Sequence, residues 1–133
     1  MRAPQTVLAF DFGTRRIGAA IGNSVTGTAR PLESFAAAPR AAAFARIAQL
    51  IEAWQPDALV VGVPSDADPA LAGTAARCRR FARQLNGRFG LPVHEIDERY
   101  STHEAQAIIG TGGDDDAMAA AVILQQYLAA PPR

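Results

Sequence analysis

The 133-residue sequence lacks the disulfides and zinc clusters that stabilise many small domains, so its stability must come from a hydrophobic core. It contains a single cysteine, Cys78, so neither an intrachain disulfide nor a cysteine cluster for zinc can form. No apolar run approaches the roughly 20 residues needed to span a bilayer, and the first residues lead straight into a strand-like segment. Since 49% of the residues are hydrophobic, we expect one cytoplasmic domain, residues 1–133, without membrane association.

Lysine is absent as well. All thirteen basic residues are arginine, and thirteen acidic residues balance them to a net charge of zero. The flat, permanently charged guanidinium group suits phosphate oxygens. A GC-rich genome, which also favours alanine, explains the same composition. The arginine content therefore identifies no partner by itself.

The pattern of apolar residues predicts an α/β domain. Five segments have the apolar character of strands: 6–12, 16–22, 28–35, 58–64 and 92–97. Four segments are predicted helices: 40–54, 70–89, a short helix opening at Ser101, and 117–128. Glycine turns join the first three strands, which indicates an antiparallel meander, and the later strands alternate with helices. We expect a mixed five-stranded sheet with helices on both faces.

An aspartate interrupts the first apolar segment. A buried carboxylate such as Asp11 is costly unless it is paired, hydrogen-bonded or bound to a metal. A strand-end aspartate that caps the following turn is the structural alternative. The next segment, 13–18 (GTRRIG), favours a functional site, because glycine lets a ligand approach the backbone closely. Thr14 and Arg15 place a hydroxyl and a guanidinium beside the carboxylate.

A second acidic position ends the last predicted strand, 92–97. The carboxyl ends of strands are where α/β domains build their sites. Side chains alternate along a strand, so Asp97 and Glu98 face opposite ways, and periodicity does not choose between them. Arg99 either holds one acid in place or reaches a phosphate. A surface ion pair followed by a helix cap at Ser101 is the structural alternative.

A third acidic group, Asp114, Asp115 and Asp116, precedes the last helix. Acidic residues at a helix start cap free N–H groups and oppose the positive end of the helix dipole. Three acidic points on a strand, a strand end and a helix start can nevertheless converge on Mg²⁺ or Mn²⁺, which prefer oxygen ligands. Two such ions about 3.5–4 Å apart activate a water and stabilise the leaving oxygen of a phosphodiester. Such a site needs neither histidine nor cysteine, and we interpret His94 and His103 as surface residues.

The predicted helix 70–89 carries five arginines and no acid: Arg77, Arg79, Arg80, Arg83 and Arg88. Its predicted apolar stripe consists of Leu71, Ala75, Cys78, Ala82, Leu85 and Phe89. At about 100° per residue, Arg80 and Arg83 lie opposite this stripe. A solvated face explains this pattern, and so does a landing surface for a nucleic-acid backbone.

Several segments, in order, resemble the YqgF/RuvX family of Holliday-junction-resolvase-like nucleases. They are 11–20 (DFGTRRIGAA), 28–32 (TARPL), 60–64 (VVGVP), 97–102 (DERYST), and 116–120 (DAMAA) with 123–125 (ILQ). The resemblance implies an RNase H-like fold and a nuclease that matures the precursor of 16S ribosomal RNA, with four-way DNA junctions as the alternative substrate. It implies Asp11, Glu98 and Asp116 as catalytic residues and ligands of Mg²⁺ or Mn²⁺, and leaves Asp114 and Asp115 as caps.

The same hypothesis assigns the arginines near these acids. Thr14, Arg15, Arg16 and Arg99 would steady the substrate backbone, together with the two arginines on the far side of helix 70–89. The expected partners are nucleic acid and ribosomal particles, and the expected state is a monomer or a weak homodimer.

Two stretches depart from the family pattern. The loop after the fourth strand is Ser65-Asp66-Ala67-Asp68-Pro69, and the loop 110–115 is short and lacks lysine. Because less positive charge weakens phosphate binding, a non-catalytic RNA-binding assembly factor on the same fold is an alternative. The Asp-Phe-Gly-Thr turn also resembles the phosphate loop of the sugar-kinase and actin ATPases, but those need two lobes and this chain supplies one.

Overall fold

The computed structural model describes residues 5–64, 69–97 and 115–129, and the structural statements below concern these ranges. The elements in chain order are β1 (Thr6–Phe12), β2 (Arg16–Asn23), β3 (Thr28–Ala36), α1 (Arg40–Trp54), β4 (Ala58–Val63), the 3-10 turn η1 (Pro69–Leu71), α2 (Ala72–Phe89), β5 (Val93–Asp97) and α4 (Asp115–Ala129). The short helix predicted at Ser101 lies outside the described residues.

The five strands form one sheet in the order β3-β2-β1-β4-β5. β1, β2 and β3 pair antiparallel, whereas β4 runs parallel to both β1 and β5. The predicted mixed sheet, an antiparallel meander extended by parallel strands, is confirmed.

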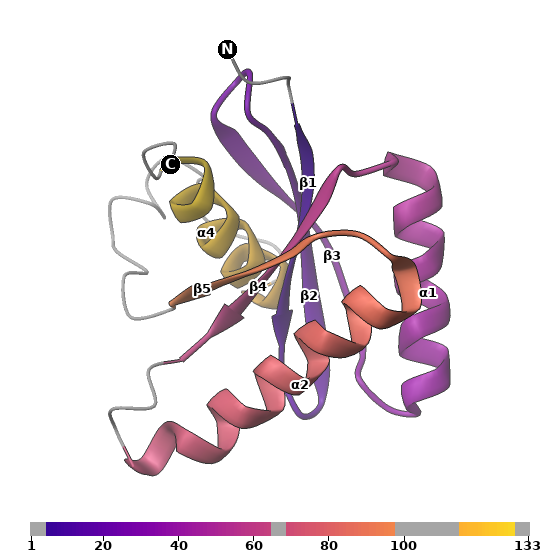
Figure 1. Ribbon diagram of the computed structural model, residues 1–133, viewed down its shortest axis with the longest axis vertical. Helices are drawn as coiled ribbons and strands as arrows, with labels where there is room; N and C mark the ends of the chain where they lie inside the picture. Colours follow the sequence, from indigo (N-terminus) through magenta and orange to yellow (C-terminus); the bar gives the residue numbers. More distant parts are fainter. Residues whose placement is uncertain (1–4, 65–68, 98–114, 130–133) are drawn as a thin grey trace.

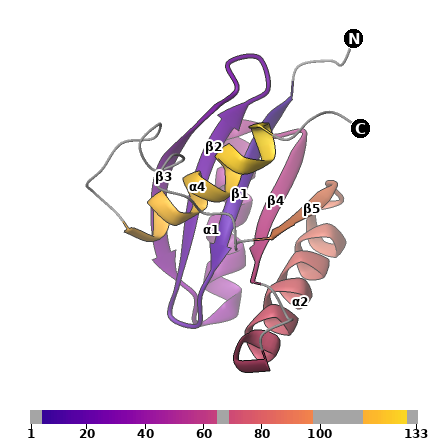
Figure 2. The same cartoon turned by 90° about the vertical axis from the view of Figure 1, so that its left-hand side faces the viewer.

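Helices cover both faces of this sheet, with α1 and α2 on one side and α4 on the other (Figures 1 and 2). Successive side chains of β1 point to opposite faces of the sheet and so contribute to two separate hydrophobic cores. Leu8, Phe10 and Phe12 belong to the cluster shared with α1 and α2, whereas Val7 and Ala9 belong to the cluster shared with α4. Every side chain of this strand therefore has an assigned face, including that of Asp11.

Aromatic rings fill the core between the sheet and the helices α1 and α2. Phe81, fully buried, stacks on Phe12 with ring centroids 4.5 Å apart and meets Phe10 edge-on at 6.3 Å. The sequence pattern placed Leu71 on the apolar stripe and did not include Phe81. In the structure, Leu71 is exposed because α2 begins one residue later, and the buried stripe is centred on Phe81.

The contact between α4 and β2 is made through very small side chains. Gly18, Ala20 and Gly22 alternate along β2 and so lie on one face of the strand. A Cβ atom on Gly22 would lie 2.9 Å from carbon atoms of Leu124 and Leu128, so α4 packs directly against the strand backbone at this point. Small residues at alternate positions therefore let α4 pack closely against this face of the sheet.

A buried amide ties α4 to the β2–β3 hairpin. The backbone N–H of Ala29 donates to Oε1 of Gln125 at 3.1 Å, and Nε2 of Gln125 donates to the carbonyl oxygen of Gly27 at 2.8 Å. Both bonds join residues almost 100 positions apart in the chain, so they fix the position of the helix along the sheet.

Candidate functional site

Asp11 lies at the end of the central strand, on the α4 face of the sheet. It continues the alternation of Val7 and Ala9, which pack under α4, and its side chain is half-buried. Its direct neighbour on β2 is Gly18. Cross-strand partners have Cα atoms about 4.5–5.5 Å apart, so whatever rests on Gly18 is next to Asp11.

The start of α4 rests on Gly18. A Cβ atom built on this glycine would lie 1.8 Å from the carbonyl oxygen of Asp116 and 2.9 Å from the backbone nitrogen of Ala117. Only a residue without a side chain fits there. Asp11 and Asp116, more than 100 positions apart in the sequence, are therefore brought together across one glycine.

From the sequence, Gly18 is expected to be one of the glycines that let a ligand approach the backbone. The structure corrects this interpretation, because the backbone of α4 covers it. The signal that could have revealed its role is the alternation of glycine, alanine and glycine at 18, 20 and 22, which indicates close packing against one face of β2.

A basic side chain of β2, that of Arg16, contacts both α4 and β3. Nε of Arg16 lies 3.6 Å from Oδ2 of Asp116, and both side chains are about half-exposed. The same guanidinium donates to Oγ of Ser34 through Nη2 at 2.8 Å and Nε at 3.3 Å. Ser34 pairs with Gly18 across β2 and β3, and sequence reasoning did not identify it. Arg16 therefore contacts a candidate catalytic acid rather than open solvent alone.

The first turn of α4 contains Asp115 and Asp116, so the helix begins two residues earlier than the predicted 117. Carboxylates in this turn face the positive end of the helix dipole, as expected. Asp115 is exposed, whereas Asp116 is half-buried beside the sheet. Asp114 lies outside the described residues.

The contacts of β5 show which of its residues face α4 and which face α2, and so on which face of the sheet its terminal Asp97 lies. His94 stacks on Tyr127 of α4 at 5.4 Å and Ile96 packs in the α4 cluster, whereas Glu95 forms an ion pair with Arg79 of α2 at 3.7 Å. By the same alternation Asp97 shares the α2 face, opposite Asp11. Glu98 and Arg99 lie outside the described residues.

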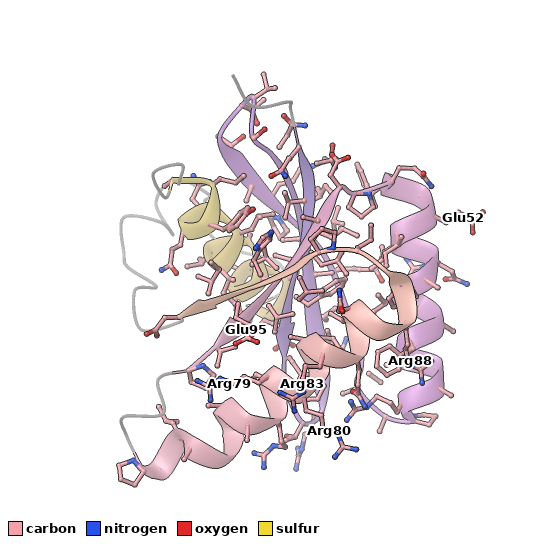
Figure 3. All side chains as sticks on the ribbon, in the orientation of Figure 1. Glu52, Arg79, Arg80, Arg83, Arg88 and Glu95 are labelled. Atoms are coloured by element: carbon pink, nitrogen blue, oxygen red, sulfur yellow. The ribbon has the colours of Figure 1, made fainter. Side chains whose placement is uncertain are left out.

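The remaining predicted binding residues fall into two groups. Thr14 and Arg15 are exposed in the tight turn between β1 and β2, which the Gly13 N–H closes by donating to the carbonyl oxygen of Arg16 at 3.0 Å. Arg80 and Arg83 are exposed on α2 (Figure 3), which covers the face of the sheet opposite α4 and Asp11 (Figure 1). The structure thus does not bring all the predicted binding residues to one place.

The donor set at this site fits a hard divalent cation. Asp11 and Asp116 offer carboxylate oxygens, which Mg²⁺ and Mn²⁺ prefer. Within residues 5–64, 69–97 and 115–129, no three acidic, histidine or cysteine side chains gather into a metal-binding group. The third ligand implied by the family resemblance, Glu98, is not among these residues.

The sheet order, the helices on both faces and the acid at the end of the central strand define an RNase H-like α/β domain. RuvC of Thermus thermophilus, solved in complex with a Holliday junction substrate, has the same fold: the TM-score is 0.66 at 16% sequence identity, over 92% of each chain. The chain belongs to the RuvX family, described as Holliday junction resolvase, whose model matches residues 5–130.

Curated relatives match over nearly the full length. A protein of Bordetella pertussis (strain Tohama I) is 56% identical over 124 residues, 93% of each chain. A protein of Bordetella petrii is 56% identical over 128 residues, 96% of this chain and 98% of the relative. Both carry the name "Putative pre-16S rRNA nuclease". In the described part of the chain, no helix has the length and apolar character that crossing a membrane requires.

Proposed function

We propose that this chain is a cytoplasmic endonuclease that hydrolyses phosphodiester bonds during maturation of the precursor of 16S ribosomal RNA. Asp11, Glu98 and Asp116 act as its catalytic acids and hold one or two Mg²⁺ or Mn²⁺ ions. The observation that carries this proposal is the packing of the first turn of α4 on Gly18, the strand partner of Asp11. This packing brings Asp116 next to Asp11, although the two acids are more than 100 positions apart in the sequence.

The third acid is proposed on the alternation of β5. His94 and Ile96, the even-numbered residues of this strand, share the α4 face with Asp11. Glu98 has the next even number, whereas Asp97 has the opposite parity. This favours Glu98 over Asp97 by a physical argument that is independent of the family resemblance.

Divalent ions bound to these carboxylates supply charge stabilisation for the phosphate and an activated water. The chain itself holds the carboxylates on a strand and on a helix start, which are rigid elements, so their oxygens need little reorganisation. Arg16, beside Asp116, partly neutralises the acids and stands within reach of a phosphate. Thr14, Arg15 and Arg99 would steady the substrate backbone from the neighbouring turn and strand end.

The family description favours a second candidate substrate, the four-way DNA junction. A junction presents two symmetric scissile strands, so its resolution requires paired active sites and hence a stable dimer. If the monomer cleaves precursor RNA, either as free RNA or within a ribosomal particle, the result supports rRNA maturation rather than junction resolution.

The test uses the purified chain and a transcript that spans the 5′ end of 16S rRNA with its leader. We expect cleavage with Mg²⁺ or Mn²⁺ and none in EDTA. Asp11→Asn and Asp116→Asn remove a ligand charge at unchanged size and should each reduce the rate by roughly 10²-fold or more.

Asp115→Asn is the matched control, because it removes the same charge from the same helical turn at an exposed position. It should cleave within about twofold of the parent. Cleavage that persists in EDTA or in Asp11→Asn would refute the metal-dependent mechanism. RNA binding without any cleavage would instead identify a non-catalytic assembly factor.

A further inference from the structure

Four arginines lie on the surface of α1 and α2, the helices that cover the face of the sheet opposite Asp11 and Asp116 (Figure 1). We call this surface the arginine strip; it consists of Arg40 of α1 and Arg80, Arg83 and Arg88 of α2. All four are exposed, and Figure 3 shows the three from α2 spaced along that helix. α2 contains no acidic residue, so nothing on the helix itself offsets their charge.

Two members of the strip are held in place by aromatic rings. The guanidinium carbon of Arg88 lies 4.1 Å from the ring centroid of Phe44, and that of Arg40 lies 6.0 Å from the same ring and 5.1 Å from the ring of Phe12. Nη1 of Arg40 also donates to Oε1 of Gln84 at 3.1 Å. Such cation–π contacts restrain the flat guanidinium groups while their outer edges stay in water.

The other two members have no acidic partner in the part of the chain that the structure describes. Arg80 and Arg83 make no ion pair there, in contrast to Arg79, which pairs with Glu95 of β5. Glu52, the one acidic residue of α1, lies near the end of that helix remote from Arg40 (Figure 3). Among the described residues, therefore, no carboxylate neutralises Arg80 or Arg83, and an anionic partner can contact both.

The strip reaches the β1–β2 turn, which lies at the same end of the molecule as the candidate site. Arg40 covers the ring of Phe12, the last residue of β1, and the exposed Thr14 and Arg15 follow directly in the turn. Asp11 precedes Phe12 but faces the other side of the sheet. A polyanion that lies on the strip can thus continue around the turn towards the site.

The chemistry of the strip favours a double helix over a single strand. Proteins that bind single strands stack the bases on exposed aromatic side chains. Here the two rings that the strip contacts, Phe12 and Phe44, are buried beneath its cations, so neither ring is open to stacking by a base. Recognition of RNA duplexes relies mainly on shape and on phosphate and sugar contacts, which such a surface can provide.

We propose that the arginine strip binds the phosphate backbone of a double-helical RNA segment, while a neighbouring segment of the same RNA enters the Asp11–Asp116 site. This inference rests on the proposed function, since it assigns a structured RNA as its substrate. The enzyme would then select a cleavage position by its distance from a helix.

The test measures binding by fluorescence anisotropy in EDTA, where no cleavage occurs. The probes are a labelled 16-base-pair RNA duplex and one of its strands alone, each titrated between 50 and 300 mM KCl. For Arg80→Gln/Arg83→Gln we expect duplex binding to weaken by roughly 20- to 60-fold at 0.1 M salt. The slope of log K against log salt should fall by about 1.4–1.8, because each lost phosphate contact removes about 0.7–0.9.

The matched control compares single substitutions. Arg83→Gln and Arg30→Gln each remove one exposed cation, but Arg30 lies over the ring of Trp54, at the opposite end of α1 from Arg40. That helix of 15 residues is about 22 Å long. Arg83→Gln should weaken duplex binding severalfold, whereas Arg30→Gln should leave it within about twofold of the parent.

Three outcomes would overturn the proposal: an unchanged salt slope in the double variant, equal weakening by Arg30→Gln, or equal weakening of the single-stranded probe. Thermal melting of each variant checks that it is folded. Because binding is read without metal, loss of nuclease activity in Asp11→Asn leaves this result unaffected, and the two proposals can fail separately.

Discussion

Gly18 is the position at which a single methyl group should damage the candidate site most. Its backbone φ lies outside the left-handed region and alanine is compatible with a strand, so the effect of Gly18→Ala is steric. The new Cβ would lie 1.8 Å from the carbonyl oxygen of Asp116 and 2.3 Å from its carbonyl carbon. Both are backbone atoms, which cannot rotate away as the end of a side chain can.

The size of the required movement follows from these distances. The contact must grow from 1.8 Å to at least 3.4 Å, the lower limit of ordinary contact, so the first turn of α4 must lift by about 1.6 Å. Overpacking of this kind costs about 1–3 kcal/mol in the free energy of unfolding. A misplacement of about 1 Å at a catalytic group can cost about 10²-fold in rate. We therefore expect Gly18→Ala to lose about 2 kcal/mol of stability and at least 10²-fold of cleavage activity.

Urea unfolding followed by circular dichroism measures the stability, and cleavage of the precursor transcript below the unfolding transition measures the activity. Gly87→Ala is the control, because a Cβ at this position in α2 meets no atom within 4 Å. It should stabilise the protein by about 0.5–1 kcal/mol and leave cleavage unchanged. A Gly18→Ala protein with the parent's unfolding midpoint and cleavage rate would refute the proposed contact between β2 and α4.

Two further predictions concern polar contacts of α4. Gln125→Ala leaves the N–H of Ala29 and the carbonyl of Gly27 without their buried partner, which should cost about 1–3 kcal/mol in urea unfolding; an unchanged midpoint would contradict the buried hydrogen bonds. Arg16→Gln removes a cation 3.6 Å from the carboxylate of Asp116, so calorimetry should show Mn²⁺ binding about two- to tenfold tighter, with the gain reduced at high salt. Weaker Mn²⁺ binding in Arg16→Gln would mean that this guanidinium organises the acids rather than competing for them.

Much of the fold could be predicted from local sequence patterns. The boundaries of β1 and α1 agree with the apolar runs, because glycine, proline and apolar spacing act within a few residues. The start of α2 was less accurate: the predicted helix included Pro69–Leu71 in part, where the chain forms a 3-10 turn. Its apolar stripe missed Phe81, since periodicity on an alanine-rich helix does not fix the centre of the buried face.

The candidate site was predictable in residue type but not in arrangement. An acid inside an apolar strand drew attention to Asp11, and the family resemblance supplied Asp116. The sequence placed Arg16 and Arg83 in one binding group, whereas the structure puts Arg16 beside Asp116 and Arg83 on the opposite face. Which face of the sheet an arginine lies on depends on how its strand or helix packs in the fold, and a local sequence pattern does not contain this information.

The sequence by itself determined the strands and helices, the faces of each strand and the residue types suited to a phosphate and a cation, because these depend on short-range periodicity and side-chain chemistry. Only the tertiary structure decided that α4 rests on Gly18, that Asp116 thereby joins Asp11, and that the arginines divide between two faces. These arrangements depend on packing between segments about 100 residues apart, and no local pattern records which helix will cover which side of a sheet.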